Sequence, residues 1–268
     1  MDDSHIPLLL STERLAPFVA IAGTERDAIE LHNQSIRLSA SLMPVIALIE
    51  ISMRNAISEA MRNKLQVPNW LTEPPSDKLH WHGGEQDLIK KAIVHARRAA
   101  YAKLNNAEKK ALDTLAYPKG LPKGLKRNKR IRARQERIQV GIGQTIAQLT
   151  LSFWKGLFAA DYEAVLWKPV LRSLFPNKKI ERVEVAANLE VIYEARNRIA
   201  HHEAVLDPRL EELEQAITFV TRNFGSRQPD QDAILARMTA PFQQDLTAQM
   251  AATRAMVARF SISTPAQS

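Results

Sequence analysis

Apolar side chains recur along most of the chain at spacings of three and four residues, the pattern of helices that bury one face. No run that alternates β-branched and polar residues between turn signals stands out, and glycine is scarce, with 9 in 268 residues. The pattern therefore predicts an all-α protein. Helices are expected at about residues 12–22, 24–42, 44–65, 85–115, 131–158, 179–201, 208–224 and 230–261.

Prolines and capping residues mark several of the expected helix boundaries. Thr24 is a cap for the second helix, and Pro44 suits the first turn of the third. Asp207 and Pro208 are expected as the N-cap and the first residue of a later helix. Pro241 should kink or split the last helix. Its inward-facing residues are expected to be Leu235, Met238, Phe242, Leu246 and Met250.

The composition limits both the chemistry and the location of the protein. There are no cysteines, which excludes disulfides and thiolate metal sites. The first residues lack the basic and then apolar plan of a signal peptide, and no apolar run approaches the ~18–20 residues of a membrane span. We therefore expect a soluble, cytoplasmic protein with no membrane partner.

The net charge of +8 is concentrated in one segment. Residues 119–137 hold nine of the 37 basic residues and one of the 29 acidic residues, so the rest of the chain has 28 of each sign. Glycine and proline among these charges predict a flexible basic loop, residues 118–137, between two helices. It has no aromatic residue to stack on a base, so we expect it to contact phosphates; a solvated linker is the alternative. The cations expected to make these contacts are Lys119, Lys123, Lys126, Arg127, Lys129 and Arg130.

The end of the 179–201 helix combines the residues best suited to chemistry. Arg196 falls on the apolar face of this helix, where a guanidinium is costly unless it is paired or faces a cleft. Asn197 and His201 are four residues apart and can touch. The helix end therefore presents a cation, an amide and an imidazole, a group that titrates near neutrality. The alternative is that these are ordinary surface residues or residues that only cap the helix. The apolar face consists of Val185, Leu189, Ile192 and Ile199.

Four other charged or polar residues are candidates for supporting this group. Glu50 and Arg54 interrupt the apolar face of the third helix at a spacing that suits an ion pair, and Glu50 is also a candidate partner for Arg196. His202 is expected either to support the site or only to cap the helix, and Glu203 to hydrogen-bond an imidazole. Adjacent histidines point to different faces of a helix, so we expect no metal bound between them.

These residues carry a resemblance to a known family. Residues 196–201 resemble the Arg-x(4–6)-His signature of HEPN-domain ribonucleases, and the string Arg-Asn-Arg-Ile-Ala-His-His-Glu at 196–203 resembles the signature of the Abi-like (abortive infection) family within that group. Residues 31–42, 49–57, 68–71, 148–158, 166–169 and 174–177 are similar to further blocks of the Abi-like family. Departures are small: Ile49 and Met53 stand at Leu positions, and Leu151 and Ser152 replace Phe and Gly.

The resemblance extends over about residues 12–224 and implies a HEPN-type helical bundle. We therefore expect one domain, residues 1–224, followed by a helical C-terminal extension and tail, residues 225–268. The family further implies a metal-independent endoribonuclease of a phage-defence or toxin system, acting as a homodimer. An antitoxin or another defence component is an implied partner, RNA is the implied substrate, and no cofactor is expected.

The residues suit such a reaction. A neutral imidazole at His201 can take the proton of the RNA 2′-OH, and Arg196 can stabilise the charge that develops on phosphorus. Asn197 would orient the imidazole or the phosphate. The competing interpretation is a non-catalytic helical module that binds RNA or a protein. A metal hydrolase is not favoured, because the spacing of His201, His202 and Glu203 does not suit chelation.

Overall fold

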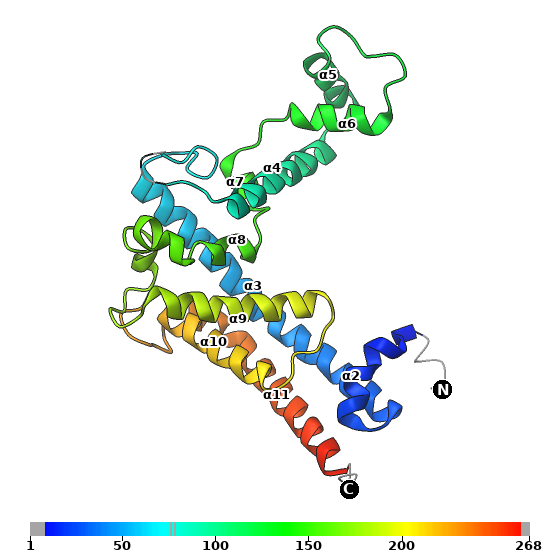
Figure 1. The fold of residues 1–268 in the computed structure, drawn as a ribbon, viewed down its shortest axis with the longest axis vertical. Coiled ribbons are helices and arrows are strands. Elements are labelled where there is room, and N and C mark those ends of the chain that lie inside the picture. Colours follow the sequence, from blue (N-terminus) through cyan, green and yellow to red (C-terminus); the bar gives the residue numbers. More distant parts are fainter. Residues whose placement is uncertain (1–8, 76, 78, 264–268) are drawn as a thin grey trace. The chain divides into compact units, whose positions relative to one another are not determined.

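The structure is a computed structural model and describes residues 9–75, 77 and 79–263. Within these ranges every regular element is helical (Figure 1), which confirms the all-α prediction. Short 3-10 and π-helical elements occupy residues 160–167 and 171–174. The α-helices are α2 (Thr12–Ala22), α3 (Glu25–Leu65), α4 (Gly83–Lys103), α5 (Asn106–Ala116), α6 (Arg127–Glu136), α7 (Ile142–Ile146), α8 (Leu151–Gly156), α9 (Arg182–Ala200), α10 (Arg209–Asn223) and α11 (Ile234–Ser263).

The chain forms two compact units whose boundaries differ from the predicted ones. The first unit consists of residues 1–53 and 172–268, and the second of residues 54–171. The segment after residue 224 clusters with the first unit, because α11 packs against α2 and α10. Phe260 of α11 joins a buried cluster with Phe18 and Leu31.

The inward face of α11 also differs from the prediction. Met238 and Phe242 are 44% and 38% exposed, whereas Thr239 is fully buried. The Thr239 hydroxyl donates a hydrogen bond to the carbonyl oxygen of Leu235, which satisfies this buried polar group inside the helix. The helix also continues through Pro241. Leu235, Leu246 and Met250 are buried as predicted, whereas the predicted tail after residue 263 lies outside the described residues.

Residues 25–65 form one helix of 41 residues, where the sequence predicted two helices that meet at Pro44. Thr24 caps this helix as expected, since its Oγ1 accepts a hydrogen bond from the Asp27 N–H at 3.1 Å. Pro44 cannot donate to the carbonyl of Ala40 four residues earlier. Ala40 is exposed, so water can donate a hydrogen bond to this carbonyl, and the helix continues.

The expectation that no segment approaches a membrane span was wrong for α3. An 18-residue window of this helix has a mean hydropathy of 1.6, so its length and composition would allow it to cross a membrane. The core helix of a globular protein meets the same criterion. In the structure 39% of this window is buried, and Val45 and Ile49 are fully buried.

Two long helices predicted in the second unit are divided in the structure. The expected helix 85–115 breaks at Asn105, whose side chain accepts a hydrogen bond from the Glu108 N–H and starts α5 with a capping box. The expected helix 131–158 is replaced by α6, α7 and α8, with Gly141 as the N-cap of α7. The predicted aromatic core is confirmed, since Phe153 and Trp154 are fully buried.

The start of α10 also departs from the prediction. Pro208 occupies the N-cap, and α10 begins at Arg209. Asp207 does not cap this helix, because its carboxylate instead accepts a hydrogen bond from Nε of Arg254 on α11 at 3.1 Å. The charge of Asp207 is therefore used to attach α11 to the connection between α9 and α10.

Candidate functional site

The predicted apolar face of α9 is buried. Val185, Leu189 and Ile192 are fully buried and Ile199 is 7% exposed, and α9 runs alongside α10 (Figure 1). The buried position between Ile192 and Ile199 is taken by Ala195, and Arg196 lies half-buried beside it. The guanidinium is therefore at the edge of the core face, where a long side chain can reach solvent.

Helix α9 ends in a Schellman motif built from the histidines of the candidate site. His201 is the C-cap, and the N–H of His202 donates to the carbonyl of Ile199 at 3.0 Å. The N–H of Glu203 donates to the carbonyl of Arg198 at 2.7 Å. These two bonds define the motif. His202 occupies the position usually taken by glycine and has a φ of +57°, in the left-handed region.

Two guanidinium groups hold the chain that follows the motif. Arg198 pairs with the carboxylate of Glu203 at 3.1 Å, and its Nε donates to the carbonyl of Ala204 at 3.1 Å. Arg14 of α2 donates to the carbonyl of His202 at 2.7 Å. The same residues line a pocket of about 440 Å³ between the start of α2 and the end of α9. The helix end is therefore fixed from both sides.

The structure thus gives different roles to the five predicted residues of this segment. Arg196 and Asn197 are half-buried in the last turn of α9, and His201 is exposed directly after it. His202 serves the helix cap, which was one of its two predicted roles. Glu203, which was expected to support an imidazole, is instead paired with Arg198.

The other predicted supporting residues lie on α3. Glu50 and Arg54 are one turn apart and both are half-buried. Glu50 belongs to the first unit, as α9 does, whereas Arg54 belongs to the second. In the part of the chain that the structure describes, no group of three or more histidine, aspartate or glutamate residues is placed to hold a metal ion.

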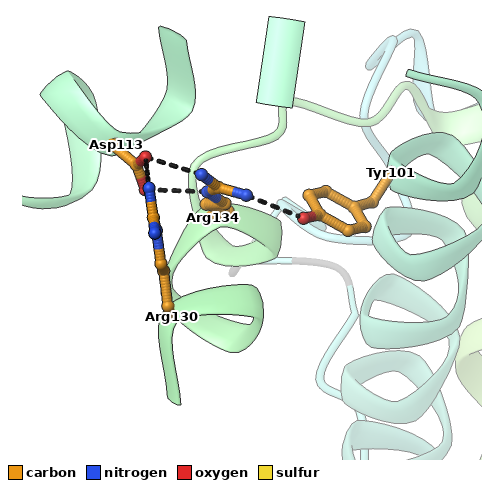
Figure 2. A network of polar contacts seen from close by, with 4 residues as sticks. All are labelled: Tyr101, Asp113, Arg130 and Arg134. Atoms are coloured by element: carbon orange, nitrogen blue, oxygen red, sulfur yellow. Dashed lines mark hydrogen bonds and ion pairs between the residues drawn. The ribbon is translucent and has the colours of Figure 1, made fainter. Parts of the chain in front are cut away.

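The basic segment is more ordered than its sequence predicted. Its second half is helix α6, and two of its arginines bind one carboxylate of α5 (Figure 2). Nε of Arg130 and Nε of Arg134 donate to Oδ1 of Asp113 at 3.0 and 2.7 Å, and each arginine makes a second bond to Oδ2. Arg134 also donates to the hydroxyl of Tyr101 on α4 at 3.2 Å. Asp113 therefore joins α5 to α6, and Arg134 joins both to α4.

This network changes the interpretation of the basic segment. Side-chain hydrogen bonds from Arg134 and then Arg130 hold the pKa of Asp113 well below its usual range, and Asp113 in turn raises the pKa of both arginines. Arg130, expected as a phosphate contact on a flexible loop, is engaged with Asp113 instead. The remaining predicted cations, Lys119, Lys123, Lys126, Arg127 and Lys129, are exposed.

Sequence reasoning missed Asp113 and Arg14 as partners of these segments. Arg14 lies 188 residues from His202 in the chain, and no sequence pattern connects the two. For Asp113 a signal was present: Arg130 and Arg134 are four apart, so a helix would place both on one face toward a shared partner. The glycines and prolines before residue 127 concealed this helix.

Comparisons of the chain with protein-family models, with curated proteins and with solved structures found no match.

Proposed function

We propose that this protein is a HEPN-type, metal-independent endoribonuclease of an abortive-infection or toxin system. The observation that carries the proposal is the end of α9, where exposed His201 directly follows the helix, four residues after half-buried Asn197 and five after half-buried Arg196. This helix end carries a cation, an amide and an imidazole within six residues of the chain. The resemblance of residues 196–203 to the Abi-like signature supports the same assignment.

The reaction follows from the chemistry of RNA, which carries its own nucleophile. The imidazole of His201 takes the proton of the 2′-OH while O2′ forms a bond to phosphorus. The bond between phosphorus and O5′ then breaks, and O5′ receives a proton from an imidazolium. Arg196 stabilises the negative charge on the phosphoryl oxygens with its N–H donors. The products are a 2′,3′-cyclic phosphate and a 5′-hydroxyl.

The fixed geometry after the helix supports a positioning role for the cap. The Schellman motif, Arg198 and Arg14 all act on the four residues that follow α9. They leave the His201 side chain exposed at a defined point of the backbone. We propose that two copies of the chain bring two such helix ends to one RNA, and that a defence or antitoxin partner controls the pair in the cytoplasm.

A second candidate function is a helical module that binds RNA or protein without cutting it. It is favoured by one observation: His202 and Glu203 are both used in the helix cap and are not arranged around His201. In this case the Arg-His spacing would serve the structure of the helix end alone.

RNA cleavage in the presence of a chelator separates the two candidates. The wild-type protein is expected to cut total RNA in EDTA and to leave 2′,3′-cyclic phosphate ends. His201→Ala should lower the rate by about 10²–10⁴-fold with an unchanged circular dichroism spectrum. His95→Ala, which removes another exposed histidine on α4, is the matched control and should retain full activity. Equal rates for wild type and His201→Ala would refute the assignment.

A further inference from the structure

A pocket of about 460 Å³ lies in the second unit, between α4 and α6. It is separate from the residues of the α9 end, since all of its lining residues belong to residues 54–171. The lining combines three arginines, two amides, two apolar side chains and one carboxylate. These residues are Val94, Arg97, Arg98, Asn128, Ile131, Arg132, Gln135 and Glu136. We call this pocket the α4–α6 groove.

The arginines of the α4–α6 groove are placed for an anionic ligand. Arg97 donates from Nε to the carbonyl of Ile138 at 3.2 Å, which orients its guanidinium. Arg98 is exposed and has no ionic or hydrogen-bonding partner among the described residues. Arg132 pairs with Glu136 at 3.4 Å, where the two side chains are 84% and 59% exposed. Such an exposed pair is worth little, so a phosphate can displace the carboxylate.

Helix α6 presents two faces with separate roles. Arg130 and Arg134 bind Asp113 and fix the helix against α5. Arg132 and Ile131 lie on the groove face. The Asp113 network therefore holds α6 and its Arg132 in a fixed position, which lowers the entropic cost of binding a ligand.

We propose that the α4–α6 groove binds a single strand of RNA. Its phosphates contact Arg97, Arg98 and Arg132, and a base or sugar lies on Val94 and Ile131. Guanidinium groups suit phosphates because their planar N–H donors match two oxygens at once. Asn128 and Gln135 supply amide donors and acceptors for a base edge. The assignment of RNA as the ligand rests on the proposed function, whereas phosphate binding rests on the groove itself.

Two other anionic partners fit the groove less well. A membrane surface is broad and does not enter a concavity between two helices, where these arginines lie. An acidic amphipathic helix needs a row of apolar contacts along a groove, and this one offers only Val94 and Ile131. An extended nucleic-acid strand carries one charge per nucleotide and needs neither a broad surface nor a row of apolar contacts. The observations therefore favour single-stranded nucleic acid.

The test measures RNA binding by full-length protein over a range of salt concentrations. The probe is a fluorescently labelled single-stranded RNA of about 12 nucleotides, within the usual site sizes for single-strand binders. All proteins carry His201→Ala, so that the RNA stays intact. Arg98→Gln with Arg132→Gln should weaken binding by about tenfold or more and flatten the slope of log affinity against log salt by about 1.4, from ~0.7 per phosphate.

Two further variants make this test specific. Arg62→Gln with Lys64→Gln removes two exposed charges from the end of α3 in the same unit and should change binding much less. Glu136→Gln removes the competing carboxylate and should tighten binding by about twofold. A gain in affinity cannot result from misfolding, so this variant supports the site independently.

The outcomes separate the groove from the proposed function. If the Arg98 and Arg132 double variant binds RNA with unchanged affinity and salt slope, the groove is not an RNA site. Competition by polyglutamate as strong as by unlabelled RNA would also overturn the assignment, in favour of an acidic protein partner. If the wild-type protein cuts no RNA but the double variant binds RNA more weakly, the groove is supported and only the nuclease assignment is refuted. Cleavage lost in His201→Ala together with unchanged RNA binding in the double variant refutes only the groove.

Discussion

Replacing Asp113 with Asn is the sharpest test of how the second unit is held together. The substitution keeps the size of the side chain and removes its charge. It leaves Arg130 and Arg134 close together with no carboxylate between them, although four hydrogen bonds reach Asp113 in the wild type. The introduced amide keeps one acceptor oxygen, but its NH2 group cannot accept a hydrogen bond from either guanidinium; Tyr101 still accepts a bond from Arg134. We therefore expect α6 to separate from α5.

The expected size of this effect follows from the exposure of the three side chains. Asp113 is 10% exposed, Arg134 13% and Arg130 38%, so the network is neither fully buried nor open to water. Breaking a fully buried ion pair costs ~3–5 kcal/mol, and an exposed pair contributes ~0.2–1 kcal/mol. We expect Asp113→Asn to lower the free energy of opening of α5 and α6 by about 2 kcal/mol.

Hydrogen exchange of the backbone amides is the suitable assay, because it reports local opening of single helices. At neutral pH, amides of residues 106–136 should exchange about 30-fold faster in Asp113→Asn, the factor that ~2 kcal/mol corresponds to. Asp87→Asn is the matched control, since Asp87 pairs with Lys90 at 3.6 Å and both side chains are about 70% exposed. It should leave exchange in the same segment unchanged.

The pH dependence gives an independent check on the same carboxylate. The pKa of Asp113 is lowered in the folded state by its bonds to Arg134 and Arg130. Its stabilising contribution is therefore complete above the usual aspartate pKa of 3.8 and is lost as the pH falls below it. In the wild type, protonation of Asp113 should reduce the hydrogen-exchange protection of α5 and α6 below about pH 4. Asp113→Asn should lack this part of the decrease. Equal protection of wild type and variant at neutral pH would show that the network does not hold α6.

Two further predictions concern the end of α9. Only glycine adopts a positive φ without strain, so His202→Gly should match the wild-type stability in thermal melts or exceed it by up to ~1 kcal/mol. His202→Val should lower the stability by about 1–2 kcal/mol. Equal stability of the Gly and Val variants would contradict the left-handed cap. If the active unit is a dimer with a shared site, mixing Arg196→Ala and His201→Ala protomers should restore RNA cleavage that neither variant has alone. Light scattering should show a dimer at micromolar concentration, and a monomer that still cuts RNA would refute the shared site.

The sequence by itself determined the helical class and several local features of the chain. Apolar spacing of three and four residues placed the buried face of α9, because this period follows directly from helix geometry. Thr24 was recognised as a cap, since capping depends on a hydrogen bond to a residue three positions on. The residues proposed for the site at 196–203 could be selected for the same reason, because they lie within eight consecutive positions at one helix end.

Only the tertiary structure decided the features that depend on distant partners. Pro44 was predicted to begin a helix, yet α3 continues through it, and α11 joins the first unit although it follows the predicted domain. The basic segment read as a loop because its glycines and prolines lie beside its charges, but Asp113 binds two of its arginines and stabilises α6 against α5. Arg14 reaches His202 across 188 residues. Contacts of this kind depend on which surfaces meet after folding, and no local pattern in the chain encodes them.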